Sequence, residues 1–120
     1  MSKAARSVFV FSIYLLVLGA VLVLVPNVLL SLFRMPETNE VWVRVTGMLV
    51  LILGYYYSTA ARNEFTEFLR ATAFARMSVL VFFFAFVVLG FAPPILILFG
   101  VIDAAAALWT LLALKADAAA

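Results

Sequence analysis

Four long apolar runs, at residues 8–25, 41–60, 73–91 and 95–114, occupy most of this 120-residue chain. A transmembrane helix needs about 20 predominantly apolar residues, and every run is close to that length. Hydrophobic residues make up 68% of the chain and charged residues 12%, whereas soluble domains are about half apolar and a quarter charged. The sequence therefore predicts a polytopic membrane protein: an all-α, antiparallel four-transmembrane-helix bundle in a single domain, 1–120.

The connections between the runs are short, and two of them carry signals of their own. Pro26 follows the first run, but apolar residues continue to Phe33, so Pro26 either ends the first helix or kinks it. Residues 61–71 combine charged side chains with Phe and Leu at helical spacing. This pattern favours an amphipathic helix or the extramembrane ends of two long helices. The alanines at 118–120 are consistent with a cloning remnant.

Lys and Arg are distributed unevenly between the two faces of such a bundle. With four spans, both termini and the connection at 61–71 share one face. That face holds six basic residues: Lys3, Arg6, Arg62, Arg70, Arg76 and Lys115. The other face holds only Arg34 and Arg44. Because basic residues accumulate on the cytoplasmic side, we expect a protein of the bacterial cytoplasmic (inner) membrane with its N- and C-termini in the cytoplasm.

The residue types that the chain lacks exclude many kinds of chemistry. It contains no cysteine and no histidine. Disulfides, zinc sites built on Cys or His, haem ligation by His and Ser-His-Asp triads are therefore excluded. A single acid within the spans is too little for most acid–base or covalent mechanisms. We expect no enzyme activity, no catalytic residue, no metal and no cofactor.

Asp103 is the one acidic residue within a predicted span, and it lies near the middle of the fourth. A charged carboxylate at the bilayer centre costs roughly 2.5–3.5 kcal/mol, so such residues are kept for pairing, protonation or ligand contact. At 1.5 Å per residue, Asp103 is expected about 13 Å and Arg44 about 5 Å below the same surface, and a long arginine side chain covers most of that difference. Arg76 comes from the opposite face and leans away. We expect Asp103 to pair with Arg44. Such a pair either fixes helix register or serves a proton-coupled step or a ligand.

Further residues are assigned to this buried polar cluster or to helix packing. Arg76, Trp42, Tyr55 and Thr110 are candidates for the cluster, although tyrosines at 55–57 are also typical of an interfacial aromatic belt. In lipid, helices associate through small residues that allow close approach. The glycines assigned to helix packing are Gly19, Gly47, Gly54 and Gly100.

Three classes of function are compatible with these patterns. The first, which we favour, is a non-enzymatic protein that binds a lipid-like or apolar small molecule, or an accessory subunit of a membrane complex. The second is a proton-coupled transporter or channel subunit, which would need an oligomer because four spans leave little room for a pathway. A membrane enzyme has the weakest support. The expected partners are the lipid bilayer, an apolar ligand and further copies of the chain or a larger complex, but no nucleic acid.

Single Gly, Arg, Pro and Asp positions recur within the apolar runs: Leu18-Gly19…Pro26 in the first, Trp42-x-Arg44-x-x-Gly47 and Leu53-Gly54-Tyr55-Tyr56 in the second, and Asp103 in the fourth. This pattern covers most of the chain and resembles small four-span bacterial membrane proteins of the DoxX-like kind. The resemblance implies a four-helix architecture and an apolar ligand, because proteins of similar fold include sterol or hydrophobic-ligand binders and subunits of quinone-linked oxidoreductases. It implies no catalytic residue, and this chain lacks the cysteine pair of some redox relatives.

Overall fold

The computed structural model describes residues 1–120 as five helices and no strand. The long helices are α1 (Lys3–Leu24), α3 (Val41–Arg62), α4 (Thr66–Val88) and α5 (Leu96–Ala119), and the short α2 (Pro26–Leu32) follows α1. Each long helix is long and apolar enough to cross a membrane. The predicted all-α fold with four membrane-spanning helices is confirmed, and the chain is an integral membrane protein.

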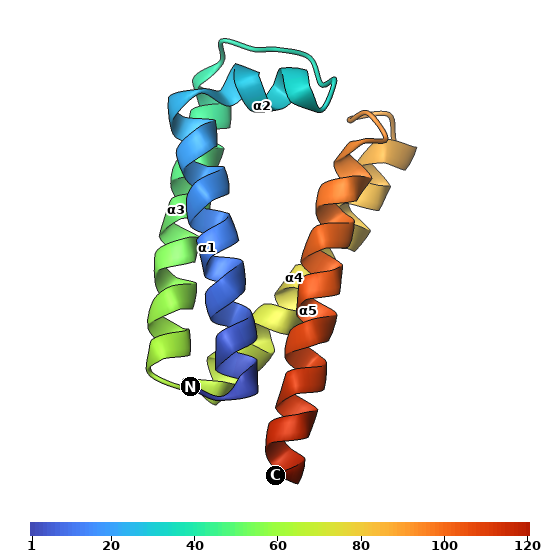
Figure 1. The fold of residues 1–120 in the computed structure, drawn as a ribbon. Helices are drawn as coiled ribbons and strands as arrows, with labels where there is room; N and C mark the ends of the chain where they lie inside the picture. The colour runs from blue at the N-terminus through green and yellow to red at the C-terminus, as the bar shows by residue number, and fades with distance from the viewer.

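The long helices form two antiparallel pairs, α1 with α3 and α4 with α5 (Figure 1). The pairs meet at one end, called the base here, which holds both chain termini and the turn at residues 63–65 (Figure 1). At the base, α1 also packs against α5. The pairs diverge toward the other end, the open end, which holds α2 and the turn at residues 89–95 (Figure 1). The bundle is therefore closed at the base and splayed at the open end.

Side chains of different size occupy the two ends of the bundle. At the base, most of the buried apolar residues are alanines, which let helix backbones approach closely. They are Ala4, Ala5, Ala60, Ala61, Ala73, Ala107 and Ala113. Toward the open end, α4 and α5 present phenylalanines to the space between the pairs: Phe82, Phe83, Phe86 and Phe99. The splayed end is thus lined by aromatic rings, whereas the base is packed with alanines.

Glycines mark the closest approaches within each helix pair. A Cβ atom added at Gly47 would lie 2.9 Å from the carbonyl oxygen of Gly19, which leaves no room for a side chain between α1 and α3. A Cβ atom added at Gly100 would lie 3.0 Å from the Cα atom of Leu80, so α5 is equally close to α4. Gly54 packs in the same way against α1. All four glycines that the sequence assigns to helix packing thus lie at helix contacts.

Pro26 ends α1 and begins a new helix. Val25 leaves the helical region with φ −140° and ψ 60°, and Pro26 is the first residue of α2. Proline has no N–H with which to continue the hydrogen bonds of α1, but its fixed φ suits the first position of a helix. The apolar run that continues to Phe33 therefore forms a separate short helix, and this helix lies across the open end (Figure 1).

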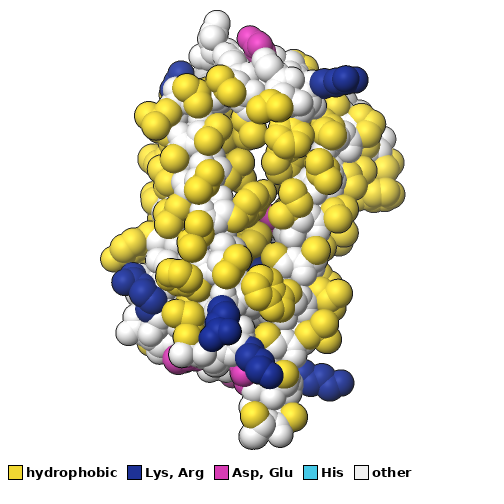
Figure 2. All heavy atoms as spheres, in the orientation of Figure 1, with side chains coloured by type: hydrophobic (Ala, Val, Ile, Leu, Met, Phe, Trp, Pro, Cys, Tyr) yellow, Lys and Arg dark blue, Asp and Glu magenta, His cyan; other side chains and the backbone are white.

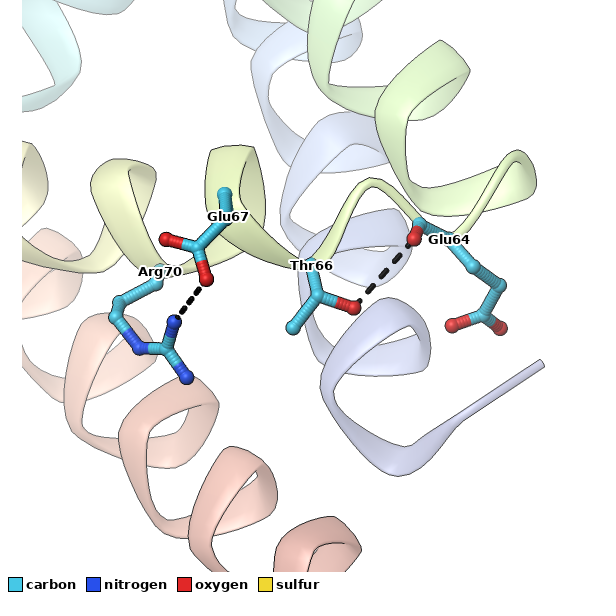
Figure 3. A network of polar contacts seen from close by, with 4 residues as sticks. All are labelled: Glu64, Thr66, Glu67 and Arg70. Atoms are coloured by element: carbon cyan, nitrogen blue, oxygen red, sulfur yellow. Dashed lines mark hydrogen bonds and ion pairs between the residues drawn. The ribbon is translucent and has the colours of Figure 1, made fainter.

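Residues 61–71 are the ends of two long helices joined by a short turn. Glu64 has a positive φ of 54° in this turn, a conformation that closes many helix C-termini. On the α4 side, Arg70 forms an ion pair with Glu67 at 2.6 Å, and the Thr66 hydroxyl donates to the carbonyl of Glu64 (Figure 3). Of the two interpretations of this segment, the structure contains the extramembrane helix ends.

Two carboxylates from other parts of the base hold the first turn of α1. Asp117 accepts hydrogen bonds from the backbone N–H groups of Lys3 and Ala4 at 3.2 and 3.0 Å. Glu64 accepts one from the backbone N–H of Ser2 at 2.7 Å, and this bond lowers the pKa of the Glu64 carboxyl below its ordinary value. N–H groups at a helix start have no intrahelical partner, and negative charge is favourable there. These three hydrogen bonds are called the base clasp here.

Candidate functional site

A cavity of about 630 Å³ lies between the two helix pairs toward the open end. All five helices contribute to its wall. Figure 2 shows it as a hollow on the side of the bundle. Of its 19 lining residues 17 are hydrophobic, and the exceptions are Thr46 and Asp103. The cavity is thus an apolar space within the membrane-spanning part of the protein, with one charged residue in its wall.

Helix register places Asp103 at the floor of this cavity, beside Arg76. Gly100, one turn before Asp103 on α5, packs against Leu80 of α4. At 1.5 Å per residue, Asp103 lies about 4.5 Å and Arg76 about 6 Å closer to the base than this contact. The two residues are therefore at nearly the same depth on neighbouring helices.

Arg76 lies just below the cavity, and only 2% of its surface is exposed. Its Nε donates to the Thr72 carbonyl at 3.1 Å, and its Nη2 donates to the hydroxyls of Thr72 and Thr110 at 3.2 and 2.9 Å. The Thr110 hydroxyl is also hydrogen-bonded to that of Ser7 on α1, at 2.7 Å. The guanidinium lies over the ring of Phe11, 4.7 Å from its centroid. This network joins α1, α4 and α5 below the cavity.

One nitrogen of the Arg76 guanidinium group makes no hydrogen bond. Its Nη1 is buried and has no hydrogen-bond partner. The charges of Arg76 and Asp103 act on each other, but no ion pair joins the two residues. Asp103 has no other side chain of the chain as an ion-pair partner either. Buried polar groups without partners are costly. The cavity wall therefore contains a carboxyl group without an ion-pair partner, and an unpaired guanidinium donor is buried beneath it.

Arg44 does not reach Asp103. Its Nη1 donates to the carbonyl oxygen of Val23 and, at 3.4 Å, to that of Leu24. These carbonyls lie in the last turn of α1, where the break before Pro26 removes the next helical donors. Arg44 thus supplies hydrogen bonds to carbonyl oxygens at the end of α1. The arginine that lies beside Asp103 is Arg76. The pairing expected from depth alone overlooked these nearer acceptors.

The six residues predicted for the buried polar cluster divide into two groups. Asp103, Arg76 and Thr110 come together at or below the floor of the cavity. Arg44 is hydrogen-bonded at the end of α1. Trp42 and Tyr55 are 68% and 61% exposed and face outward from α3, as residues of an interfacial belt do.

Several residues of the site belong to one face of α1 that the sequence reading did not single out. Ser7, Phe11, Tyr14 and Leu18 follow one another at spacings of four, three and four residues. Such spacing places them on the same side of a helix. Ser7 and Phe11 contact the arginine network, whereas Tyr14 and Leu18 line the cavity. Helical periodicity anchored on the polar Ser7 and Tyr14 would have found this face.

The cavity wall contains few polar groups. No group of three or more His, Cys, Asp or Glu residues comes together that could hold a metal ion. Besides Asp103, the polar groups in the wall are the hydroxyls of Tyr14 and Thr46. An apolar lining with a few directing polar groups is the usual composition of a small-molecule binding pocket.

Comparisons with protein-family models, with curated proteins and with solved structures give no match to this chain. No activity is therefore carried over from another protein. The function has to be inferred from the cavity, its single acid and the membrane around it.

Proposed function

We propose that this protein binds a lipid-like or apolar small molecule in the cavity between its two helix pairs and that it is not an enzyme. The observation that carries the proposal is a cavity of about 630 Å³ with 17 hydrophobic residues among 19. Pockets for small molecules typically measure ~300–1,000 Å³. An apolar ligand is also the class that the resemblance to DoxX-like proteins implies.

The splay of the bundle supports this proposal. Two helix pairs that served only to anchor a chain would pack along their whole length, because each polar group or gap in the membrane has a cost. Here the pairs pack closely at the base and diverge toward the open end (Figure 1), and the cavity between them is lined by phenylalanines and Asp103. A ligand in this space would give the separated walls the packing contacts that they lack.

The test compares two substitutions that lie two residues apart on α4. Val79 lines the cavity, whereas Val81 is exposed on the outer surface of the same helix. Val79→Phe should fill part of the cavity and lower the amount of copurifying apolar molecules several-fold, measured by mass spectrometry of the protein in lipid nanodiscs. Val81→Phe should leave this amount unchanged. Equal retention by both variants and the unaltered protein, at similar melting temperatures, would overturn the proposal and favour an accessory subunit.

A proton-coupled transporter or channel subunit is the alternative function, and one observation supports it. Polar side chains continue below Asp103 through Arg76, Thr110 and Ser7 toward the base. The chain should be reconstituted in liposomes that contain a pH-sensitive dye, with Asp103→Asn as the matched control. We expect equal proton flux from both proteins. A flux that is present with Asp103 and absent with the variant would replace binding by proton coupling as the function.

We also propose that the base faces the cytoplasm of a bacterial inner membrane. Basic residues near the base outnumber those near the open end, and the excess marks the cytoplasmic side. Because the chain has no cysteine, single cysteines can be placed without background. In intact cells, Glu37→Cys should react with a membrane-impermeant maleimide and Glu67→Cys should not. The opposite labelling pattern would reverse the orientation.

A further inference from the structure

The side chains in the cavity wall are almost all without hydrogen-bond donors. None of the 19 lining residues is Lys, Arg, His, Trp, Asn or Gln, so no lining side chain carries an N–H group. An ionised Asp103 carboxylate only accepts hydrogen bonds, and the Thr46 hydroxyl already donates to the carbonyl of Trp42 at 2.9 Å. The Tyr14 hydroxyl has no partner in the chain and can either donate or accept. The wall therefore offers a ligand mainly acceptors.

Aromatic rings add to this acceptor character. The face of an aromatic ring carries partial negative charge and attracts cations. Two rings of the wall lie about one helical turn from Asp103. Phe99 precedes Asp103 by four residues on α5, and a Cβ atom added at Gly100 would lie 3.4 Å from the ring of Phe83. The six aromatic residues of the wall are Tyr14, Phe33, Phe82, Phe83, Phe86 and Phe99.

The positive charge of Arg76 is not part of this wall. Arg76 is buried beneath the cavity and does not line it. Its guanidinium is bonded to the hydroxyls of Thr72 and Thr110 and lies over the ring of Phe11. A ligand that contacts Asp103 is thus closer to the carboxylate than to the guanidinium, and Coulomb energy falls with distance. Because no ion pair joins Asp103 to any side chain, the cavity can hold its counter-charge.

We propose that the cavity binds apolar molecules that carry an organic ammonium group, with the ammonium beside Asp103 and the apolar part extending toward α2. This inference rests on the proposed function and specifies the class of ligand. The lining residues that α2 contributes, Leu29 and Leu30, are apolar and suit an alkyl chain. The polar end of the ligand therefore has its partners at the floor of the cavity.

An ammonium group matches this wall better than other polar groups do. It has only donors, so its N–H groups can bond to the Asp103 carboxylate and to the Tyr14 hydroxyl. Its charge is attracted both by the carboxylate, where little water screens it, and by the rings. An alcohol can bond to the same two groups, but it has no charge for them to attract. An anion is repelled by Asp103, and an alkane leaves both groups without a partner.

The experiment uses four probes with the same twelve-carbon chain: dodecylamine, which is protonated at neutral pH as lysine is, dodecanol, dodecanesulfonate and dodecane. Each is added at neutral pH to the protein in nanodiscs of zwitterionic lipid, and the bound amount is measured by mass spectrometry relative to nanodiscs without protein. The protein should retain about tenfold more dodecylamine than dodecanol. Asp103→Asn keeps the shape of the side chain without its charge. It should lower dodecylamine retention to that of dodecanol and leave dodecane retention unchanged.

A second pair of variants tests the rings at neighbouring positions of α4. Phe83 lines the cavity, whereas Phe84 does not and is 58% exposed. Phe83→Leu should lower dodecylamine retention about threefold without changing that of dodecane, and Phe84→Leu should change neither. Melting temperatures establish that the variants are folded. If Asp103→Asn does not fold, the two phenylalanine variants decide, and equal dodecylamine retention by both contradicts the proposal.

The possible outcomes separate this inference from the proposed function. Equal retention of dodecylamine and dodecanol, both above empty nanodiscs, would overturn the ammonium preference and leave apolar binding intact. Preferred retention of dodecanol or dodecanesulfonate would have the same consequence. A dodecylamine preference that persists in folded Asp103→Asn would place the ammonium outside the cavity and refute the inference. Absence of retention for all four probes would remove both proposals.

Discussion

The two ends of the bundle differ in how closely their helices pack. At the base, alanines and small hydroxyl side chains bring α1, α4 and α5 together, and the base clasp holds the first turn of α1. At the open end the helix pairs diverge, phenylalanines line the space between them, and α2 extends from the end of α1 over this space (Figure 1). We propose on this basis that the base provides most of the stability, whereas the open end provides the space for the proposed ligand. Three pairs of substitutions test this difference between the ends, and a fourth tests the pH dependence of the base clasp.

The largest difference is expected between two Leu→Ala substitutions. Leu69 at the base is 0% exposed, whereas Leu53 in the cavity wall is 44% exposed. Leu69→Ala should lower the free energy of unfolding by about 2 kcal/mol, the low end of the usual range, because side chains in lipid lose packing but little transfer energy. Leu53→Ala should cost less than ~0.5 kcal/mol. Unfolding by titration with a denaturing detergent measures both, and equal losses would contradict the proposed division.

The next pair removes one hydroxyl from each end. Thr110→Val takes an acceptor from the buried Nη2 of Arg76 and a partner from Ser7, so it should cost about 1–2 kcal/mol. Thr46→Val in the cavity wall removes only a bond to the carbonyl of Trp42 and should cost less than ~0.5 kcal/mol. Melting temperatures in detergent compare the two. A larger loss for Thr46→Val would show that the open end contributes more to stability than its packing indicates.

The third pair removes one carboxylate from each end. Asp117→Ala deletes two hydrogen bonds of the base clasp and should cost about 1 kcal/mol, as the loss of a helix cap does. Glu37→Ala removes the acceptor of the Ser31 hydroxyl on α2 and should leave global unfolding unchanged. Hydrogen exchange provides the readout: amides of the first turn of α1 should exchange faster in Asp117→Ala, and only those of α2 in Glu37→Ala. Faster exchange throughout the protein in Glu37→Ala would contradict this expectation.

The smallest effect concerns pH. The hydrogen bond from Ser2 lowers the pKa of the Glu64 carboxyl below its ordinary value of 4.5, so Glu64 stabilises the folded state fully above that value. This contribution is lost as the pH falls through the lowered pKa of the folded state. Because Glu64 is exposed, solvent screens the effect, and the melting temperature should fall only slightly. Glu64→Gln should remove this part of the pH dependence, and Glu67→Gln should retain it.

The sequence was sufficient for the architecture and for part of the site. Membrane spans follow from the length of apolar runs, and inward faces follow from small and polar residues at helical spacing, so the four helices, the glycine contacts and the buried position of Arg76 could all be expected. The place of Thr110 beside that arginine could also be expected, because each lies on the small or polar face of its helix.

The arginine that lies beside Asp103 and the position of the cavity could not be predicted, because both depend on how the helices are placed in space. Depth along the membrane normal favoured Arg44, but the carbonyls freed where α1 ends lie closer to it. The cavity lies where the helix pairs diverge, between side chains that come from all five helices. Periodicity reports which face of a helix is buried, but it does not report how far that face stands from its neighbour.

The position of α2 determines the medium in which ligand binding has to be measured. Because this helix lies across the open end of the bundle and the hollow opens on the side (Figures 1 and 2), a ligand of the proposed kind would reach the floor from the hydrocarbon phase and not from the aqueous one. A dissociation constant expressed as a concentration in water would then mostly reflect how strongly the molecule partitions into the bilayer. Mole fraction in the lipid is the meaningful scale, and two ligands of different solubility can be ranked only on it.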